Sequence, residues 1–302
     1  MLWFRNLIWY QFTPTANFNE ALLSDALSAA PFVPCRGAEA KSAGFGAPAT
    51  VLDEPVFTSQ GFHLIALHSE DKILPSSVIK EAVAEKVAEI EAKESRKVFR
   101  REQQQLKEEM ELTLLPRAFT RKRMTRALIA PQQGWICVDA SSHTRAEELM
   151  SALREALGSL KAVLVNTKHS PARLMTDWVL DAQPIAANFA LGEDAELVDP
   201  LNSGSQIKLK GQVLNQADVQ THLQGGLMVD RLALGFDEQL EFVLHSDLSI
   251  KRLRPTETAA ERLESDQDDP LAALDTEVAH LGLELTRLLP ELVTAFGGPA
   301  EA

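Results

Sequence analysis

The sequence has too few cysteines for a disulfide scaffold or a four-cysteine zinc site, because only Cys35 and Cys137 occur among its 302 residues. It contains 15 glycines and 15 prolines, which excludes collagen-like and low-complexity chains. No apolar run approaches the roughly eighteen residues that a membrane-spanning helix needs. The first ten residues lack a basic segment followed by a small-residue cleavage site. We therefore expect a cytoplasmic protein with both thiols reduced.

Catalytic and cofactor motifs are also absent from the sequence. It has no phosphate-binding P-loop, no HExxH or CxxC metal or redox motif, and no GxSxG nucleophile motif. His63 and His68 are five residues apart on one predicted strand, so they lie on opposite faces and suit a shared metal poorly. The sequence thus predicts no catalytic residue, no metal site and no cofactor, and we expect that the protein is not an enzyme.

Charge is present in excess of one sign but is unevenly distributed. The chain has 30 basic and 43 acidic residues, a net charge of -13. Residues 71–126 contain 14 Lys/Arg and 10 Asp/Glu, whereas residues 255–302 contain 11 acidic residues and 2 arginines. A basic middle and an acidic tail allow one surface to bind phosphate while the rest of the protein repels it.

Hydrophobic periodicity predicts short strands mixed with helices, which indicates the α+β class with antiparallel sheets. We predict an acidic linker at 257–269. Strands are predicted at 1–10, 62–68, 127–130, 135–139, 162–165, 206–210, 227–236 and 240–244, with 250–253 as a candidate extension of the last. Helices are predicted at 20–30, 144–157 with Gly158 as its cap, 171–180, 216–223 and 271–296.

A longer helical pattern begins after Pro75 and ends at Pro116. Its apolar stripe is Ile79, Val83, Val87 and Ile90, and it fades beyond Ile90. One continuous helix from 76 to 111 would be about 54 Å long, which exceeds the diameter of a small domain. We therefore predict two helices in a projecting antiparallel hairpin that turns within 93–104.

Basic residues cluster in and just after this hairpin. The pairs 96/100 and 97/101 have i, i+4 spacing and would each share a helix face. The cations are Arg96, Lys97, Arg100 and Arg101, followed by Arg117, Arg121, Lys122, Arg123 and Arg126. Such a cluster suits phosphate contacts, which need charge rather than base-specific geometry. A solvated helix face with internal salt bridges to Glu94, Glu102 and Glu108 explains it about equally well.

Phe119 stands between these cations after a proline turn. An aromatic side chain in a charged setting is a candidate anchor of a protein interface. It could equally pack over a local hydrophobic core.

Several short motifs, in order along the chain, together resemble the bacterial recombination-associated RdgC family. The most specific is Leu-Leu-Pro-Arg-Ala-Phe at 114–119. The others are MLWFRNL at 1–7, KILPS with VIK at 72–80, LGSL at 157–160, TDWV at 176–179 and SIKRL at 249–253. The resemblance covers the whole chain.

The resemblance implies a nucleoid-associated protein that binds double-stranded DNA with little sequence preference. It implies a homodimer that forms a ring with a basic inner surface around DNA, and that limits recombination by the RecA recombinase. Each subunit would be horseshoe-shaped. Residues 1–74 and 116–180 would form a central region, 75–115 the helical tip, and 181–302 a base that includes the acidic linker and the C-terminal helix.

The resemblance also assigns expected roles to individual positions. Phe119 matches the aromatic residue of the tip-to-tip dimer contact, and Arg117 matches the basic residue beside it. Arg96 and Lys97 match basic residues of the tip, and Lys208 and Lys210 match a basic strand near the ring lining. Gly211 stands where a further lysine can occur, which puts the strength of that DNA contact in doubt.

The expected DNA-binding set combines these positions with the basic cluster. It comprises Arg96, Lys97, Arg100, Arg117, Arg121, Lys122, Arg123, Lys208 and Lys210. The alternative is a protein-interaction scaffold that uses the helical tip without direct DNA binding.

Overall fold

The computed structural model describes residues 2–15, 18–263 and 269–300. Its strands form one twelve-stranded sheet in the order β2-β4-β5-β6-β1-β12-β11-β10-β8-β9, with β3 added beside β4 and β7 beside β1. Neighbouring strands pair in antiparallel fashion. The strands are β1 (Asn6–Thr13), β2 (Lys41–Gly46), β3 (Val56–Ser59), β4 (Phe62–Ile73), β5 (Phe119–Ala130), β6 (Trp135–Asp139), β7 (Lys161–Leu164), β8 (Phe189–Asp199), β9 (Asn202–Leu209), β10 (Met228–Phe236), β11 (Leu240–His245) and β12 (Ile250–Pro255). The predicted α+β class is confirmed.

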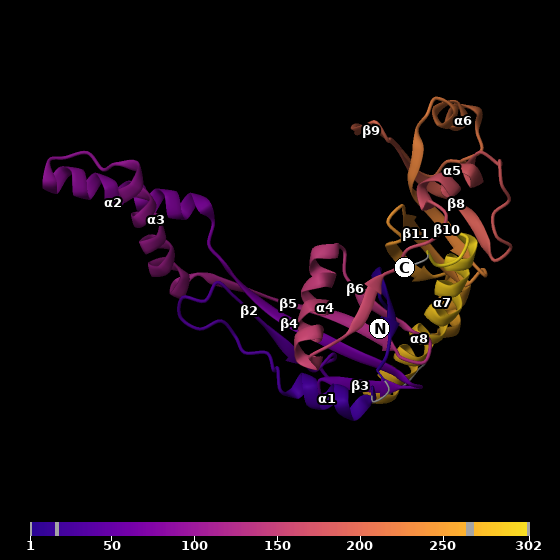
Figure 1. The fold of residues 1–302 in the computed structure, drawn as a ribbon, viewed down its shortest axis with the longest axis horizontal. Helices are drawn as coiled ribbons and strands as arrows, with labels where there is room; N and C mark the ends of the chain where they lie inside the picture. Colours follow the sequence, from indigo (N-terminus) through magenta and orange to yellow (C-terminus); the bar gives the residue numbers. More distant parts are fainter. Residues whose placement is uncertain (1, 16–17, 264–268, 301–302) are drawn as a thin grey trace.

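Helices cover both faces of one half of this sheet and one face of the other half (Figure 1). The helices are α1 (Glu20–Ser28), α2 (Ser76–Glu94), α3 (Arg100–Leu114), α4 (His143–Leu157), α5 (Pro171–Val179), α6 (Ala217–Gln224), α7 (Glu257–Leu263) and α8 (Pro270–Ala295), with a short 3-10 helix η1 (Leu115–Arg117). The predicted cap of α4 is confirmed, because Gly158 adopts a left-handed conformation with φ of 72°.

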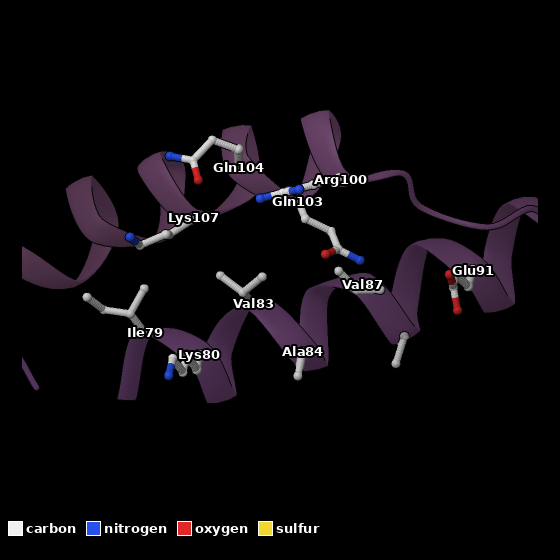
Figure 2. A pocket seen from close by; sticks show the side chains of 11 residues that line it. Ile79, Lys80, Val83, Ala84, Val87, Glu91, Arg100, Gln103, Gln104 and Lys107 are labelled. Atoms are coloured by element: carbon white, nitrogen blue, oxygen red, sulfur yellow. The ribbon is translucent and has the colours of Figure 1, made fainter. Parts of the chain in front are cut away.

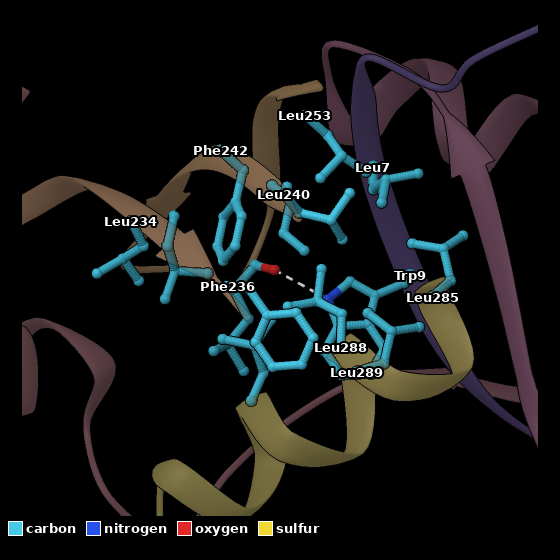
Figure 3. Packing of buried hydrophobic residues seen from close by; sticks show 14 of the residues in the cluster. Leu7, Trp9, Leu234, Phe236, Leu240, Phe242, Leu253, Leu285, Leu288 and Leu289 are labelled. Carbon is cyan, nitrogen blue, oxygen red and sulfur yellow. Dashed lines mark hydrogen bonds between the residues drawn. The ribbon is translucent and has the colours of Figure 1, made fainter. Parts of the chain in front are cut away.

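The larger hydrophobic core lies between the sheet and helices α5, α6 and α8. Figure 3 shows Leu285 and Leu288 of α8 packed toward Trp9 of β1 and Phe236 of β10. The Trp9 Nε1 donates a hydrogen bond to the carbonyl oxygen of Leu248 at 2.9 Å, which satisfies the one polar atom of that buried ring. This core extends along most of the sheet and holds its two halves together.

A second hydrophobic core lies on the other face of the sheet, beneath α1 and α4. Alternate residues of β1 contribute to the two cores, because successive side chains of a strand point to opposite faces. Leu7 and Trp9 belong to the larger core, whereas Ile8 and Tyr10 belong to the second. Within the described residues, strands β8 to β12 contribute no side chain to the second core. On that half of the sheet, the face that bears α1 and α4 elsewhere is left uncovered.

Helices α2 and α3 form a hairpin that extends away from the sheet (Figure 1). We call these two helices, with the residues between them, the tip. The predicted break is confirmed, since α2 ends at Glu94 and α3 begins at Arg100. Figure 2 shows a groove between the helices, of about 680 Å³, with Val83 and Val87 on one side and Gln103 on the other. The tip therefore encloses little apolar surface.

Three sequence-based predictions differ from the structure. Residues 250–255 form a separate strand, β12, which pairs with β11 and with β1 rather than extending β11. Strands β2, β3 and β8 and residues 119–126 of β5 were not predicted as strands. Strand β2 contains two glycines, β3 has only four residues, and β8 carries charged residues between its apolar ones. The start of the predicted acidic linker is helix α7, and residues 264–268 lie outside the described part of the chain.

The sheet continues from the predicted central region into the predicted base without interruption, through the pairing of β1 with β12. The division into central region, tip and base stays a prediction. In the part of the chain that the structure describes, none of the helices combines the length and apolar character needed to cross a membrane.

Candidate nucleic-acid interface

The uncovered half of the sheet carries a hollow of about 340 Å³, which we call the basic cleft. Five cationic side chains and two carboxylates line it, together with His245. The cations are Lys208, Lys210, Arg231, Lys251 and Arg252, and the carboxylates are Asp194 and Glu196. An excess of cations in a hollow focuses a positive potential there.

The strand register shows that these side chains share one face of the sheet. Residues directly opposite each other in an antiparallel pair point to the same side. Lys208 is opposite Glu196, Glu196 is opposite Arg231, and Arg231 is opposite His245. On the other side of β11, Lys251 is opposite Asn6 of β1. Asn6, Ile8 and Tyr10 are spaced two residues apart, so they point to the same face, which is the face on which α1 and α4 lie.

Three carboxylates form ion pairs with cations of the cleft without neutralising all of them. The Arg231 Nη1 lies 2.8 Å from Glu196 Oε2, and the Lys208 Nζ lies 3.9 Å from the same oxygen. The Arg252 Nη1 lies 3.4 Å from Asp194 Oδ2. In the described part of the chain, Lys210 makes no ion pair. Arg231 Nε also lies 3.5 Å from Asp230 Oδ2. Three carboxylates paired with the five cations of the cleft leave a positive remainder for a phosphate group.

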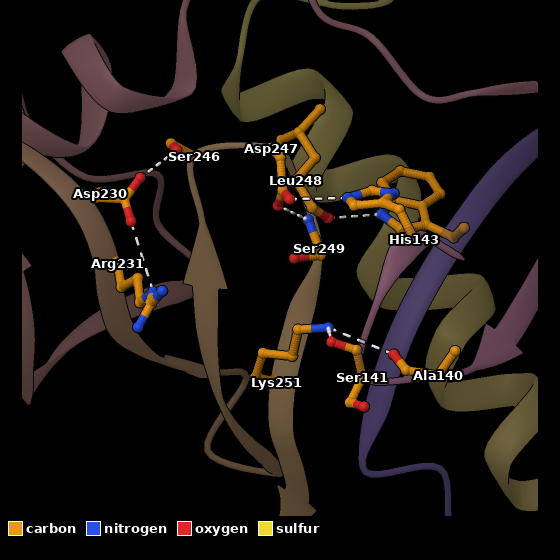
Figure 4. A network of polar contacts seen from close by, with 11 residues as sticks. Ala140, Ser141, His143, Asp230, Arg231, Ser246, Asp247, Leu248, Ser249 and Lys251 are labelled. Atoms are coloured by element: carbon orange, nitrogen blue, oxygen red, sulfur yellow. Dashed lines mark hydrogen bonds and ion pairs between the residues drawn. The ribbon is translucent and has the colours of Figure 1, made fainter. Parts of the chain in front are cut away.

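The Lys251 ammonium group is half-buried within the basic cleft. Its Nζ donates to the carbonyl oxygens of Ala140 and Ser141 at 3.4 and 3.3 Å (Figure 4). Burial lowers the pKa of Lys251, although Asp247 and Asp139 partly oppose that shift. Burial, followed by the charge of Arg231, also lowers the pKa of His245. Both shifts arise first from burial, which disfavours the charged form of each group.

A polar contact beside the cleft fixes the turn between β11 and β12. The His143 Nε2 lies 2.8 Å from Asp247 Oδ2, and the Ser249 backbone N–H donates to Asp247 Oδ1 at 2.9 Å (Figure 4). Burial by itself would raise the pKa of Asp247, but its hydrogen bonds with Ser249 and His143 outweigh burial and lower it to about 2. This contact ties the start of α4 to the strand that bears Lys251.

The cations that follow the tip are divided between the two faces of β5. Odd-numbered residues of β5 include Ala127 and Ile129 of the second core, so Arg121 and Arg123 lie on the face of the basic cleft. Lys122 points to the opposite face, so it does not join them. Arg123 Nη1 lies 3.0 Å from Asp71 Oδ2, and Arg121 lies 3.9 Å from the same atom.

The cations of the tip are arranged differently from the sequence-based prediction. Arg96 and Lys97 lie between the helices, so the expected shared helix faces with Arg100 and Arg101 do not form. Arg96 forms internal salt bridges with Glu94 and Glu102, as the alternative of a solvated helix face predicted. Its Nε lies 2.5 Å from Glu94 Oε2, and its Nη2 lies 2.6 Å from Glu102 Oε1.

Phe119 is exposed over 84% of its surface at the start of β5. It pairs across the ladder with Ile73, which is also exposed. The interpretation in which Phe119 covers a local core is therefore wrong. Arg117 is exposed in η1, directly before this strand.

Comparison with known proteins places these features in a family. A family model described as "RdgC: Putative exonuclease, RdgC" matches residues 2–299. The recombination-associated protein RdgC of Pseudomonas paraeruginosa (strain DSM 24068 / PA7) is 41% identical over 300 residues, which cover 98% of both chains. The chain belongs to the RdgC family. The RdgC proteins of Pseudomonas syringae pv. syringae and Shewanella loihica are 42% and 40% identical, also over 98% of both chains.

The resemblance inferred from the ordered motifs is confirmed, and the RdgC relatives associate the chain with recombination by name. Sequence reasoning nevertheless missed much of the basic cleft. Lys251 and Arg252 were noted only as part of a family motif, and Arg231 and His245 were not noted. Leu232, Leu234 and Phe236 of β10, and Leu240, Phe242 and Leu244 of β11, recur at every second position, and this spacing is the sequence signal that could have found them.

Gly211, the position at which the family resemblance led us to expect that a lysine can occur, follows β9 with φ of 58°. Its backbone N–H donates to Asp194 Oδ1 at 3.1 Å. A left-handed backbone suits glycine, so the turn after Lys210 has a conformation that a lysine side chain would strain. Within the described residues, no group of three or more side chains is arranged to hold a metal ion.

Proposed function

We propose that the protein binds double-stranded DNA, without preference for sequence, through the face of the sheet that bears the basic cleft. The observation that carries this proposal is the common face of Lys208, Arg231 and Lys251, which lie on separate strands of a rigid sheet. Side chains that are spaced along a surface and differ little in chemistry suit the regular phosphates of a duplex. Arg121 and Arg123 extend the same face toward the tip.

The overall negative charge does not oppose this proposal. The net charge of -13 is an average over the chain, and screening limits its reach to about 10 Å at moderate salt. A phosphate in the cleft therefore interacts mainly with the cations that line it. Acidic surfaces elsewhere would repel DNA and restrict it to the basic face.

We further propose that two copies form a ring around the duplex, with Phe119 in the contact between tips. Its exposure of 84%, next to the exposed Ile73, supports this role, because a partner that covers this apolar surface would remove it from water. A closed ring would retain DNA by topology as well as by contact. A protein that encircles DNA in the nucleoid would compete with RecA for the same DNA, which is how we expect it to limit recombination.

The test is fluorescence anisotropy with two duplexes of equal length and unrelated sequence, titrated over a range of salt. Both should bind equally, and each phosphate contact should add about 0.9 to the slope of log affinity against log salt. The double variant Arg231→Gln, Lys251→Gln should bind both duplexes more weakly and reduce the slope by roughly 1.8. A flat salt response, or an unchanged slope in this variant, would contradict the proposal.

The matched control is Arg173→Gln, an exposed arginine of α5 on the opposite side of the sheet. It removes one positive charge, half of the charge removed in the double variant, and should leave the slope unchanged. No binding of either duplex at low salt would favour the scaffold, which the exposed Phe119 would also suit. Loss of an end label from a duplex in the presence of magnesium would favour the exonuclease that the family description names, and would contradict our expectation of a non-enzymatic protein.

A further inference from the structure

Phe99 is an exposed aromatic side chain between α2 and α3. It is 75% exposed and directly precedes α3. Because β4 leads into α2 and α3 leads back to β5, this turn lies at the end of the tip remote from the sheet (Figure 1). We call residues 95–101 the apex turn. The basic cleft and the Phe119 contact do not use Phe99.

The backbone of the apex turn is held by several specific contacts. Ser95 adopts a left-handed conformation with φ of 52°, and the Val98 side chain is buried. The Val98 backbone N–H donates to Glu91 Oε1 at 3.0 Å. Arg96 binds Glu94 and Glu102, one on each side of the turn. Phe99 is therefore presented on a preorganised loop, which lowers the entropic cost of using it in a contact.

Four cations precede and follow Phe99 along the apex turn. Glu102 and Glu94 neutralise Arg96. Their hydrogen bonds raise the pKa of Arg96, and the bond to Glu102 has the larger effect. Lys97, Arg100 and Arg101 form no ion pair within the described residues. An exposed aromatic ring beside uncompensated cations is the combination by which proteins hold single-stranded nucleic acid, with the ring stacked on a base and the cations near its phosphates.

The form of the DNA follows from the stacking requirement. In a duplex both faces of each base are covered by its neighbours, so a phenylalanine must unstack a step before it can enter. An unpaired base offers a free face at no such cost. We propose that Phe99, with Lys97, Arg100 and Arg101, stacks on an unpaired base and forms a contact for single-stranded DNA at the apex turn. This deepens the proposed DNA binding by assigning a ligand to the tip cations, and it is separate from the duplex contact at the cleft.

The experiment measures the affinity of the full chain for labelled oligo(dT) and for a duplex of the same length. Phe99→Ala should weaken oligo(dT) binding by roughly tenfold, within the range known for loss of one stacked base, and leave duplex binding unchanged. Phe99→Trp should retain oligo(dT) binding and show more fluorescence quenching on addition of oligo(dT) than the wild type. Since Phe99 is exposed, both variants should fold, which circular dichroism can check.

The matched control is Leu112→Ala, which removes an apolar side chain that is 59% exposed on α3, away from the apex turn. It should change neither affinity. Unchanged oligo(dT) binding in Phe99→Ala, or failure of Phe99→Trp to retain it, would overturn the proposal. A parallel loss of both affinities with a lower solution mass would show that Phe99 contacts a protein chain instead, and would overturn it as well.

The same measurements separate this proposal from the one on which it rests. If the cleft variant loses duplex affinity while Phe99→Ala keeps its affinity for oligo(dT), only the apex-turn proposal fails. If the wild-type protein binds neither ligand, both proposals fail.

Discussion

The sheet and the tip differ in how much of their apolar side-chain surface is buried. Both faces of the sheet around β1 are buried under helices, so that Leu7 and Ile8 are each fully enclosed although they point in opposite directions. In the tip, Ile79 is the buried residue of α2 and Leu106 that of α3. The sheet is therefore stabilised by apolar burial. The tip has little buried apolar surface, so its amphipathic groove, Phe99 and several cations remain accessible.

The largest expected change in the free energy of unfolding comes from a cavity in the larger core. Leu285→Ala removes a fully buried side chain of α8 and should lower the free energy of unfolding by about 2–5 kcal/mol. The control is Leu283→Ala on the same helix, where the side chain is 54% exposed and the change should stay within about 0.5 kcal/mol. Urea denaturation measures both, and equal losses would contradict the role of burial.

A smaller effect should follow from the same substitution in the tip. Leu106→Ala should lower the free energy of global unfolding by less than about 1 kcal/mol, because the tip can open locally while the sheet stays folded. Hydrogen exchange should show faster exchange of amides in α2 and α3 and unchanged exchange in β1 and β6. If the amides of the sheet were also accelerated, the tip would be part of the same cooperative unit, and the contrast would be wrong.

The smallest effect concerns the contact between His143 and Asp247 beside the basic cleft. The pKa of Asp247 falls from 3.8 to about 2, so the contact stabilises the fold above pH 3.8, and this contribution is lost as the pH falls toward 2. Both side chains are nearly half exposed, so we expect less than about 1 kcal/mol. Thermal melts of His143→Ala and of the wild type should differ near neutral pH and converge in acid. A constant difference would show that the contact does not act through Asp247.

Features governed by neighbouring residues were predictable from the sequence. The break between α2 and α3 follows from a fading apolar stripe, and the end of α4 follows from Gly158, which can adopt a left-handed backbone. The strands predicted at 127–130 and 135–139, which are the end of β5 and β6, were found because each is a short apolar run and the Pro-Gln-Gln-Gly sequence between them favours a hairpin turn. In each case the physical cause lies within a few residues of its effect.

The candidate site was predicted less well. Successive side chains of a strand point to opposite faces, so cations that are adjacent in sequence are separated in space. Arg121, Lys122 and Arg123 form one basic run, yet the middle residue lies on the other face of β5. Residues 117–126 were not predicted as a strand, so this division was not foreseen. Conversely, Arg231 and Lys251 are twenty residues apart in sequence and meet on one face because β10, β11 and β12 are neighbours.

The sequence by itself determined the α+β class, most helices and hairpins, and membership of the RdgC family, since local periodicity and ordered motifs are properties of the chain. Only the tertiary structure decided which cations share a face, that Arg96 is neutralised, and that Phe99 and Phe119 are exposed. Those outcomes depend on strand register and on which helices cover which part of the sheet, and both arise from contacts between residues far apart in the chain.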